Sequence, residues 1–173
     1  GSRHTLSVTA DGATIPPWEQ GYVQMISPQN KHVDLLNAMV QAKTTMTPGA
    51  VPFSKCFAGD AVRIVENTDE YKNGDEGVLL SVVGGGSTRP RKRSARGGYA
   101  ADARVGNVRL RNGTIVQVKD RHIAPSYATT VHKVQGSEYG TVLLVLFAGT
   151  HPNLCTREMV YTSITRAQRQ LGI

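Results

Sequence analysis

The chain has 173 residues, 39% of them hydrophobic, and a formal net charge of +7 at pH 7. That length can bury one ordinary core and one small satellite domain. No apolar stretch approaches the roughly 20 residues of a membrane helix and no secretory signal pattern opens the sequence, so we expect no membrane segment and an intracellular location, cytoplasmic or nuclear.

The first residues and the two cysteines carry little functional signal. Gly1 and Ser2 look like the remnant of a cleaved tag, and residues 1–17 are interpreted as a lead-in segment. Cys56 and Cys155 are far apart and lack the CxxC spacing of zinc sites. Reduced thiols are therefore expected, with neither a disulfide nor a metal site.

Residues 18–55 predict a strand, a polar turn and a helix. Residues 22–26 alternate weakly, and Asn30 is a plausible N-cap for the helix that follows. A helical apolar stripe is formed by Val33, Leu35, Leu36 and Val40.

Residues 57–123 change to strand-type alternation. The segments GDAVRIVEN and NGDEGVLLSVV alternate around Gly-Asp turns, and an Asn-Gly pair separates two alternating runs in VGNVRLRNGTIVQVKDRHI. This pattern predicts a small antiparallel barrel.

A glycine-rich basic segment, residues 84–98, interrupts the predicted barrel. Its five cations account for five of the formal +7, so the basicity is local. The segment is interpreted as a loop that is mobile in the free chain and contacts nucleic-acid phosphates. A nuclear-localisation cluster and a solvated hairpin tip are the alternatives. The five cations are Arg89, Arg91, Lys92, Arg93 and Arg96.

Residues 125–173 return to an α/β pattern. The apolar run 142–146, bounded by Gly140 and Gly149, predicts a strand buried on both faces, as in a parallel sheet covered by helices. Residues 129–134 can form a short helix that Gly136 would stop. Thr130 and His132 on that segment offer small donors for phosphate oxygens.

Two further polar features follow. Residues 135–138, with sequence QGSE, place an amide, a bare backbone, a hydroxyl and a carboxylate in one tight turn. Residues 157–169 predict a helix with Met159 or Val160, Ile164 and Ala167 near one side. Arg166 lies toward another surface, where a planar guanidinium can stabilise charge on a transferring γ-phosphoryl group. A solvated surface arginine is the alternative.

Together these segments resemble the second motor domain of superfamily 1 helicases of the RecD-like branch. TVHKVQGSE is similar to motif V, YTSITRA to motif VI, and residues 22–43 to motif IV. FAGDAVRIVEN and YKNGDEGVLLSV resemble the SH3-like barrel inserted into that domain. The implied fold is α/β: a RecA-like domain of residues 18–55 and 125–173, with a mostly parallel sheet and flanking helices, interrupted by an SH3-like barrel at 57–123.

The resemblance also implies roles for single residues. Thr130 and His132 would contact single-stranded nucleic acid, and Arg166 would be the arginine finger. Val134 departs from the small residue usual at its position in motif V. The nucleotide contacts would be Gln135, Gly136, Glu138 and Lys31, although a solvated lysine in a first helical turn explains Lys31 equally well.

The implied function is that of a C-terminal fragment of an ATP-dependent helicase, acting on DNA in the 5′ to 3′ direction. ATP and Mg²⁺ would be held mainly by a first motor domain upstream, because the sequence has neither GxxxxGK[ST] nor an apolar strand ending in adjacent acidic residues. The fragment alone is therefore expected not to hydrolyse ATP. A non-catalytic nucleic-acid-binding module and a viral-type superfamily 1 RNA helicase remain as alternatives.

Overall fold

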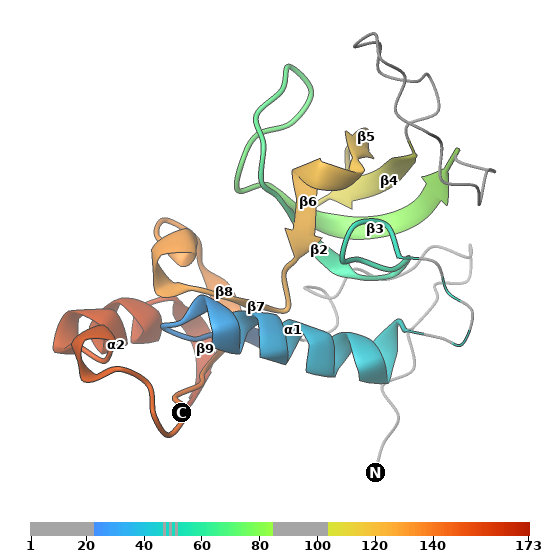
Figure 1. Cartoon of the computed structure of the whole chain (residues 1–173). Helices are drawn as coiled ribbons and strands as arrows, with labels where there is room; N and C mark the ends of the chain where they lie inside the picture. Colours follow the sequence, from blue (N-terminus) through green and yellow to red (C-terminus); the bar gives the residue numbers. More distant parts are fainter. Residues whose placement is uncertain (1–22, 47, 49, 51, 85–103) are drawn as a thin grey trace, which may run out of the picture. The chain divides into compact units, whose positions relative to one another are not determined.

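The computed structural model describes residues 23–46, 48, 50, 52–84 and 104–173. The chain forms two compact units (Figure 1): Gly1–Ala50 with Pro125–Ile173, and Val51–Ala124. The lead-in segment 1–17 and the five cations of the basic segment lie outside the described residues. Within the described parts, no helix is long and apolar enough to cross a membrane.

The first unit is built on a four-stranded sheet in the order β7-β1-β8-β9. All three strand pairs are parallel, which confirms the predicted parallel sheet. Ile26, Val142 and Leu144 are buried on one sheet face, with Met159 and Val160 packed against them. The strands are β1 (Val23–Ile26), β7 (Ala128–Thr129), β8 (Tyr139–Leu144) and β9 (Ala167–Gly172).

Strand β8 differs from its prediction at both ends. It begins at Tyr139 and contains Gly140, and it ends at Leu144, so that Leu146 is 42% exposed. Pairing with two neighbours sets these bounds, since Tyr139 pairs with Ala167 of β9. A Cβ at Gly140 would lie 2.6 Å from Arg169 Nη2, so a larger residue there would displace the end of that exposed, flexible side chain.

Helix α1 (Asn30–Thr44) confirms the predicted helix but not its cap or its buried face. Gln29 is the N-cap and its side chain makes no capping bond, so Asn30 is the first helical residue. Of the predicted apolar stripe only Leu36 is buried, at 8% exposure, and Leu35 is 48% exposed. The buried side chains of the helix are His32, Leu36, Asn37 and Gln41.

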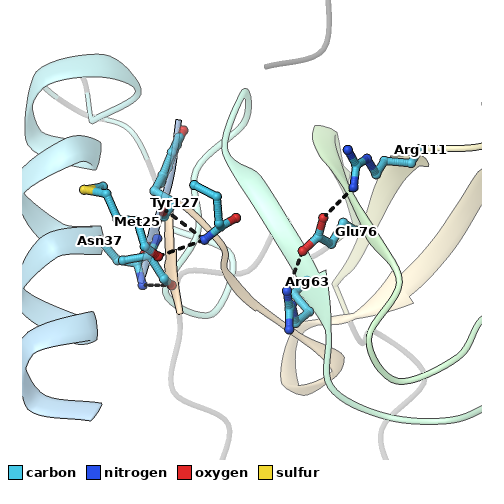
Figure 2. Close-up of polar contacts among 8 residues, drawn as sticks. Met25, Asn37, Arg63, Glu76, Arg111 and Tyr127 are labelled. Atoms are coloured by element: carbon cyan, nitrogen blue, oxygen red, sulfur yellow. Dashed lines mark hydrogen bonds and ion pairs between the residues drawn. The ribbon is translucent and has the colours of Figure 1, made fainter. Parts of the chain in front are cut away.

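The polar face of α1 is buried because it meets the edge of a strand. Asn37 donates from Nδ2 to the Ala128 carbonyl at 3.1 Å and accepts from the Ala128 N–H at 2.9 Å (Figure 2). Residues 127 and 129 of the same segment use their carbonyls to bond β1. The Asn37 amide therefore replaces a further strand on the outer edge of β7 and satisfies backbone groups that would otherwise be buried unpaired.

The helix after β7 is shorter than predicted. The expected helix at 129–134 is a 3₁₀ turn, η2 (Val131–Val134), and Thr129 belongs to β7. A second 3₁₀ turn, η3 (Pro152–Leu154), precedes helix α2. Gly136 adopts φ +84, a left-handed conformation that favours glycine.

Helix α2 (Arg157–Ile164) begins as predicted, with the Thr156 hydroxyl accepting from the Met159 N–H at 3.2 Å. The expectation that the helix continues to residue 169 is wrong, since the chain turns at 165–166 and enters β9. Strand pairing with β8 overrides the local helical pattern. Met159 and Val160 nevertheless pack against the core, as the spacing predicted. Ala167 packs there from β9 rather than from a helix, and Ile164 is half-buried and not part of that core cluster.

The second unit is a five-stranded sheet in the order β5-β4-β3-β2-β6. The pairs β2/β3, β3/β4 and β4/β5 are antiparallel, as predicted. A 3₁₀ turn, η1 (Asp120–His122), joins β5 to β6. The strands are β2 (Ala61–Ile64), β3 (Glu76–Val83), β4 (Val105–Leu110), β5 (Ile115–Lys119) and β6 (Ile123–Pro125).

The antiparallel unit has its own apolar core, in which Phe53, Leu79 and Val118 are fully buried. One ionic network crosses its strands. Glu76 binds the guanidinium of Arg63 through one carboxylate oxygen, and Arg111 Nη1 lies 3.3 Å from the other (Figure 2). Arg63 thus keeps a charge partner although it is only 7% exposed.

Candidate functional site

The parallel sheet sorts the predicted site residues to two ends. Residues that precede β8 and β9, namely 135–138 and Arg166, lie at the end where the strands begin, here called the amino end. Residues that follow β1 and β7, namely 27–31 and Thr130, lie at the opposite or carboxyl end.

Arg166 at the amino end is held by the turn 135–138 and by helix α2. Its Nη1 donates to the Ser137 carbonyl at 3.4 Å, and its Nε donates to the Thr162 carbonyl at 3.3 Å. Its own carbonyl accepts from the Tyr139 N–H at 2.9 Å. The half-buried guanidinium is therefore oriented by backbone groups from two segments, although Arg166 itself lies in the turn after α2 rather than on the helix.

The turn 135–138 presents its polar groups outward. Gln135, Gly136 and Glu138 are exposed, and the Glu138 carboxylate accepts from Gln168 Nε2 at 2.8 Å. Sequence reasoning missed both the Ser137 carbonyl and Gln168. The signal for Gln168 would have been a strand beginning at Ala167, which the expected helix concealed.

A guanidinium next to an exposed polar turn is suited to an oxyanion ligand. Arginine offers a planar set of donors that matches phosphate oxygens, and the backbone bonds to Arg166 reduce the freedom lost when a ligand binds. Within the described ranges, no group of three His, Cys, Asp or Glu side chains is arranged to hold a metal ion.

The carboxyl end brings together two segments that are distant in sequence. The Ser27 N–H donates to the Thr129 carbonyl at 3.0 Å, so the residues after β1 and β7 are neighbours. Thr130 is only 8% exposed, whereas His132 and Lys31 are exposed. Lys31 was expected to share the nucleotide site with residues 135–138, but the sheet places it at the same end as Thr130.

Residues 125–173 match the model of the family described as UvrD-like helicase C-terminal domain. The chain is 32% identical over 155 residues to the ATP-dependent RecD2 DNA helicase of Deinococcus radiodurans, covering 86% of this chain and 19% of that protein. It is 30% identical over 139 residues to the RecBCD enzyme subunit RecD of Mycobacterium tuberculosis, covering 79% of this chain and 21% of that protein. The chain thus spans about a fifth of the length of these curated relatives.

Solved structures agree on the fold. The Bacteroides Pif1 helicase in complex with ADP-AlF3 and ssDNA aligns with 99% of this chain and 42% of its own, at a TM-score of 0.56 and 15% identity. Pif1 helicase from Candida albicans aligns with 88% of this chain and 44% of its own, at a TM-score of 0.55 and 12% identity. The similarities together support a superfamily 1 helicase C-terminal domain, with a mixed α/β fold whose parallel sheet matches a RecA-like domain.

Proposed function

We propose that this chain is the C-terminal motor domain of a RecD-like helicase that uses ATP to move along DNA in the 5′ to 3′ direction. The named relatives that support this are a DNA helicase and a RecBCD subunit. Because the chain spans only about a fifth of their length, the activity belongs to the parent protein, and the fragment alone is proposed to hydrolyse no ATP.

The observation that carries the proposal is the position of Arg166. Its bonds to the Ser137 and Thr162 carbonyls aim a guanidinium at the face of the turn 135–138. Bound ATP, held with Mg²⁺ mainly by a first motor domain, would supply the γ-phosphoryl group that is transferred to water. Arg166 would stabilise the charge that develops there. Gln135, Gly136 and Glu138 would face the nucleotide.

The carboxyl end would carry the single-stranded nucleic acid. Thr130 and His132 are proposed to contact its phosphates, and the basic cluster at 89–96 to add affinity without sequence preference. The Bacteroides Pif1 structure that shares this fold contains ssDNA, which supports a DNA strand as the partner.

The antiparallel unit is proposed to be an SH3-like barrel inserted into the motor domain. Strands β5 and β6 lie at opposite edges of the sheet, although only η1 joins them. In a flat sheet those edges would be roughly 19 Å apart at about 4.8 Å per strand. Three linking residues reach at most about 14 Å between the flanking Cα atoms. The sheet must therefore curl toward closure, which supports the barrel.

The test uses the full-length parent protein. Arg166→Ala should reduce ssDNA-stimulated ATP turnover by roughly 10³-fold or more, and Arg166→Lys should rescue it poorly because lysine lacks the planar fork. Arg157→Ala, which changes an exposed arginine in the first turn of α2, is the matched control and should leave turnover unchanged. Turnover that stays near normal in Arg166→Ala would assign that residue to the surface.

A further inference from the structure

The turn between β1 and α1 contains buried polar atoms that lack hydrogen-bond partners. Among the described residues, Ser27 Oγ, Gln29 Oε1 and His32 Nδ1 have none. Ser27 is fully buried and His32 is 8% exposed. Buried polar groups in native proteins nearly always have a partner, which can be a water or a ligand. Ser27 Oγ and His32 Nδ1 can donate to an acceptor from outside the chain, whereas Gln29 Oε1 accepts and would pair with a donor such as water.

The same turn leads into a long helix whose N-terminus has no side-chain cap. Helix α1 has 15 residues, no side-chain capping bond and no acidic residue in its first turn. Its first backbone N–H groups and its dipole favour an anion. The exposed Lys31 adds positive charge at this position.

Two other segments converge on this turn. Ile26 pairs with Thr129, so Ser27 and Thr130 leave adjacent strands side by side, and the Thr130 side chain makes no capping bond to η2. The His32 ring stacks on Phe147, which follows β8, with ring centroids 4.5 Å apart and tilted by 35°. The imidazole is thus fixed against an aromatic face while its Nδ1 is unpaired.

We propose that residues 27–32 form a seat for one phosphate group of the single-stranded nucleic acid. Ser27 Oγ, His32 Nδ1 and the first N–H groups of α1 are the donors, and Phe147 is a positioning residue that holds the His32 ring. The seat rests on the proposed function. It adds residues 27–32 to the surface, including Thr130 and His132, that is proposed to bind single-stranded nucleic acid. It also assigns the turn between β1 and α1 to the binding of single-stranded nucleic acid rather than to the binding of ATP.

The chemistry favours a phosphate over a nucleobase. Ser27 precedes the N-terminus of α1 and His32 lies in its first turn, where negative charge is stabilised, and the nearest carboxylate in the helix is Asp34, beyond the first turn. A stacked base would need an open aromatic face, but His32 already covers Phe147. Because the donor atoms are buried in the free chain, the phosphate reaches them after a local rearrangement of the turn 27–31, while the His32 ring keeps its place on Phe147.

Binding of a 12-nucleotide oligothymidylate to the 173-residue chain tests the seat by fluorescence anisotropy. Ser27→Ala and His32→Ala should each weaken binding by about 10-fold, the effect of one hydrogen bond to a charged group. Ser81→Ala, which removes a hydroxyl bonded to Asn107 in the other unit, is the matched control and should leave affinity unchanged. Phe147→Leu should weaken binding by a few fold, and this effect should vanish in the His32→Ala background.

Stability separates a binding role from a structural one. Ser27→Ala removes a buried hydroxyl that has no partner, so the unfolding midpoint should stay the same or rise while the affinity falls. A midpoint that falls together with the affinity would show that Ser27 supports the fold and would overturn the seat.

Two further outcomes distinguish this seat from the function on which it rests. If His132→Ala weakens binding while Ser27→Ala and His32→Ala do not, the seat is wrong, and the proposed nucleic-acid-binding surface that includes His132 stands. If the unsubstituted chain binds no oligothymidylate at low salt, both the proposed nucleic-acid-binding surface and the seat are wrong for this chain.

Discussion

The two units differ in what they bury. The antiparallel unit has an apolar core of residues such as Phe53, Leu79 and Val118, and only Asp60, Arg63 and His122 among its described polar side chains are buried. The parallel unit buries polar side chains at both its strand edges and its helix faces. They are Gln24, Ser27, His32, Asn37, Gln41, Thr45, Ser126, Thr129, Thr130 and Ser163.

The two kinds of buried side chain stabilise the fold in different ways. Burial alone makes an apolar core stabilise the folded state, whereas each buried polar group needs a hydrogen-bond partner to offset the cost of its desolvation. In the parallel unit some of these partners are backbone groups, as for Asn37, and others are absent, as for Ser27. The antiparallel unit thus relies mainly on apolar burial, whereas the parallel unit relies more on polar pairing, which under our proposal a ligand completes around Ser27 and His32.

The largest expected effect concerns the two thiols, one in each unit. Cys56 is fully buried, and this burial, with a smaller contribution from the Asp60 carboxylate, raises the pKa of its thiol well above the ordinary value. Cys155 is exposed. A maleimide should therefore label Cys155 about 10³-fold faster or more, because Cys56 reacts only from opened states.

Labelling followed by mass spectrometry measures both rates. Cys155→Ser should leave only the slow thiol, and Cys56→Ser only the fast one. Rapid labelling of Cys56 in the native chain would show that the antiparallel core opens easily. The thiols of the two units would then not differ in accessibility.

The next effect compares two asparagines. Asn37→Ala leaves the N–H and carbonyl of Ala128 without their partner and should lower the free energy of unfolding by about 1–3 kcal/mol. Asn107→Ala removes a surface bond to Ser81, 3.0 Å long, and should cost about 0.5 kcal/mol or less. Urea unfolding monitored by circular dichroism measures both, and equal losses would argue against Asn37 as a strand substitute.

The smallest effect depends on pH. Backbone hydrogen bonding at the start of α2, with the Thr156 side chain, lowers the pKa of Glu158 from its ordinary 4.5. A carboxyl with a depressed folded pKa stabilises the chain above pH 4.5 and loses that contribution as the pH falls. Glu158→Gln should therefore slightly flatten the acid dependence of the unfolding midpoint. Glu70→Gln, exposed and outside any helix, should produce a smaller change.

Periodicity and turn residues were sufficient to predict several elements. A strand ending at Ile26, a helix beginning near Asn30 and alternating strands around residues 61–64 and 115–119 all follow from local pattern. These segments satisfy their preferences within a few residues, so the tertiary structure does not override them.

The remaining features depend on partners that are distant in sequence. Asn37 is buried because it bonds Ala128, 91 residues away, and no helical pattern contains that information. Residues 157–171 contain neither glycine nor proline, so the end of α2 at Ile164 becomes visible only through the pairing of β9 with β8. For the same reason the motif that contains Arg166 is visible in the sequence but its bond to the Ser137 carbonyl is not, and only the sheet shows that Lys31 lies at the end opposite residues 135–138.

The Asn37 amide also has a consequence for self-association. A sheet edge with free N–H and carbonyl groups can recruit a strand from another molecule, which is a common route to aggregation. Asn37 blocks this route on β7. Among the described residues, no strand covers the outer edge of β9, which carries Gln168, Arg169 and Gln170. Concentrated solutions of this chain should therefore be most sensitive to substitutions on β9, where the Arg169 charge opposes the approach of a second copy.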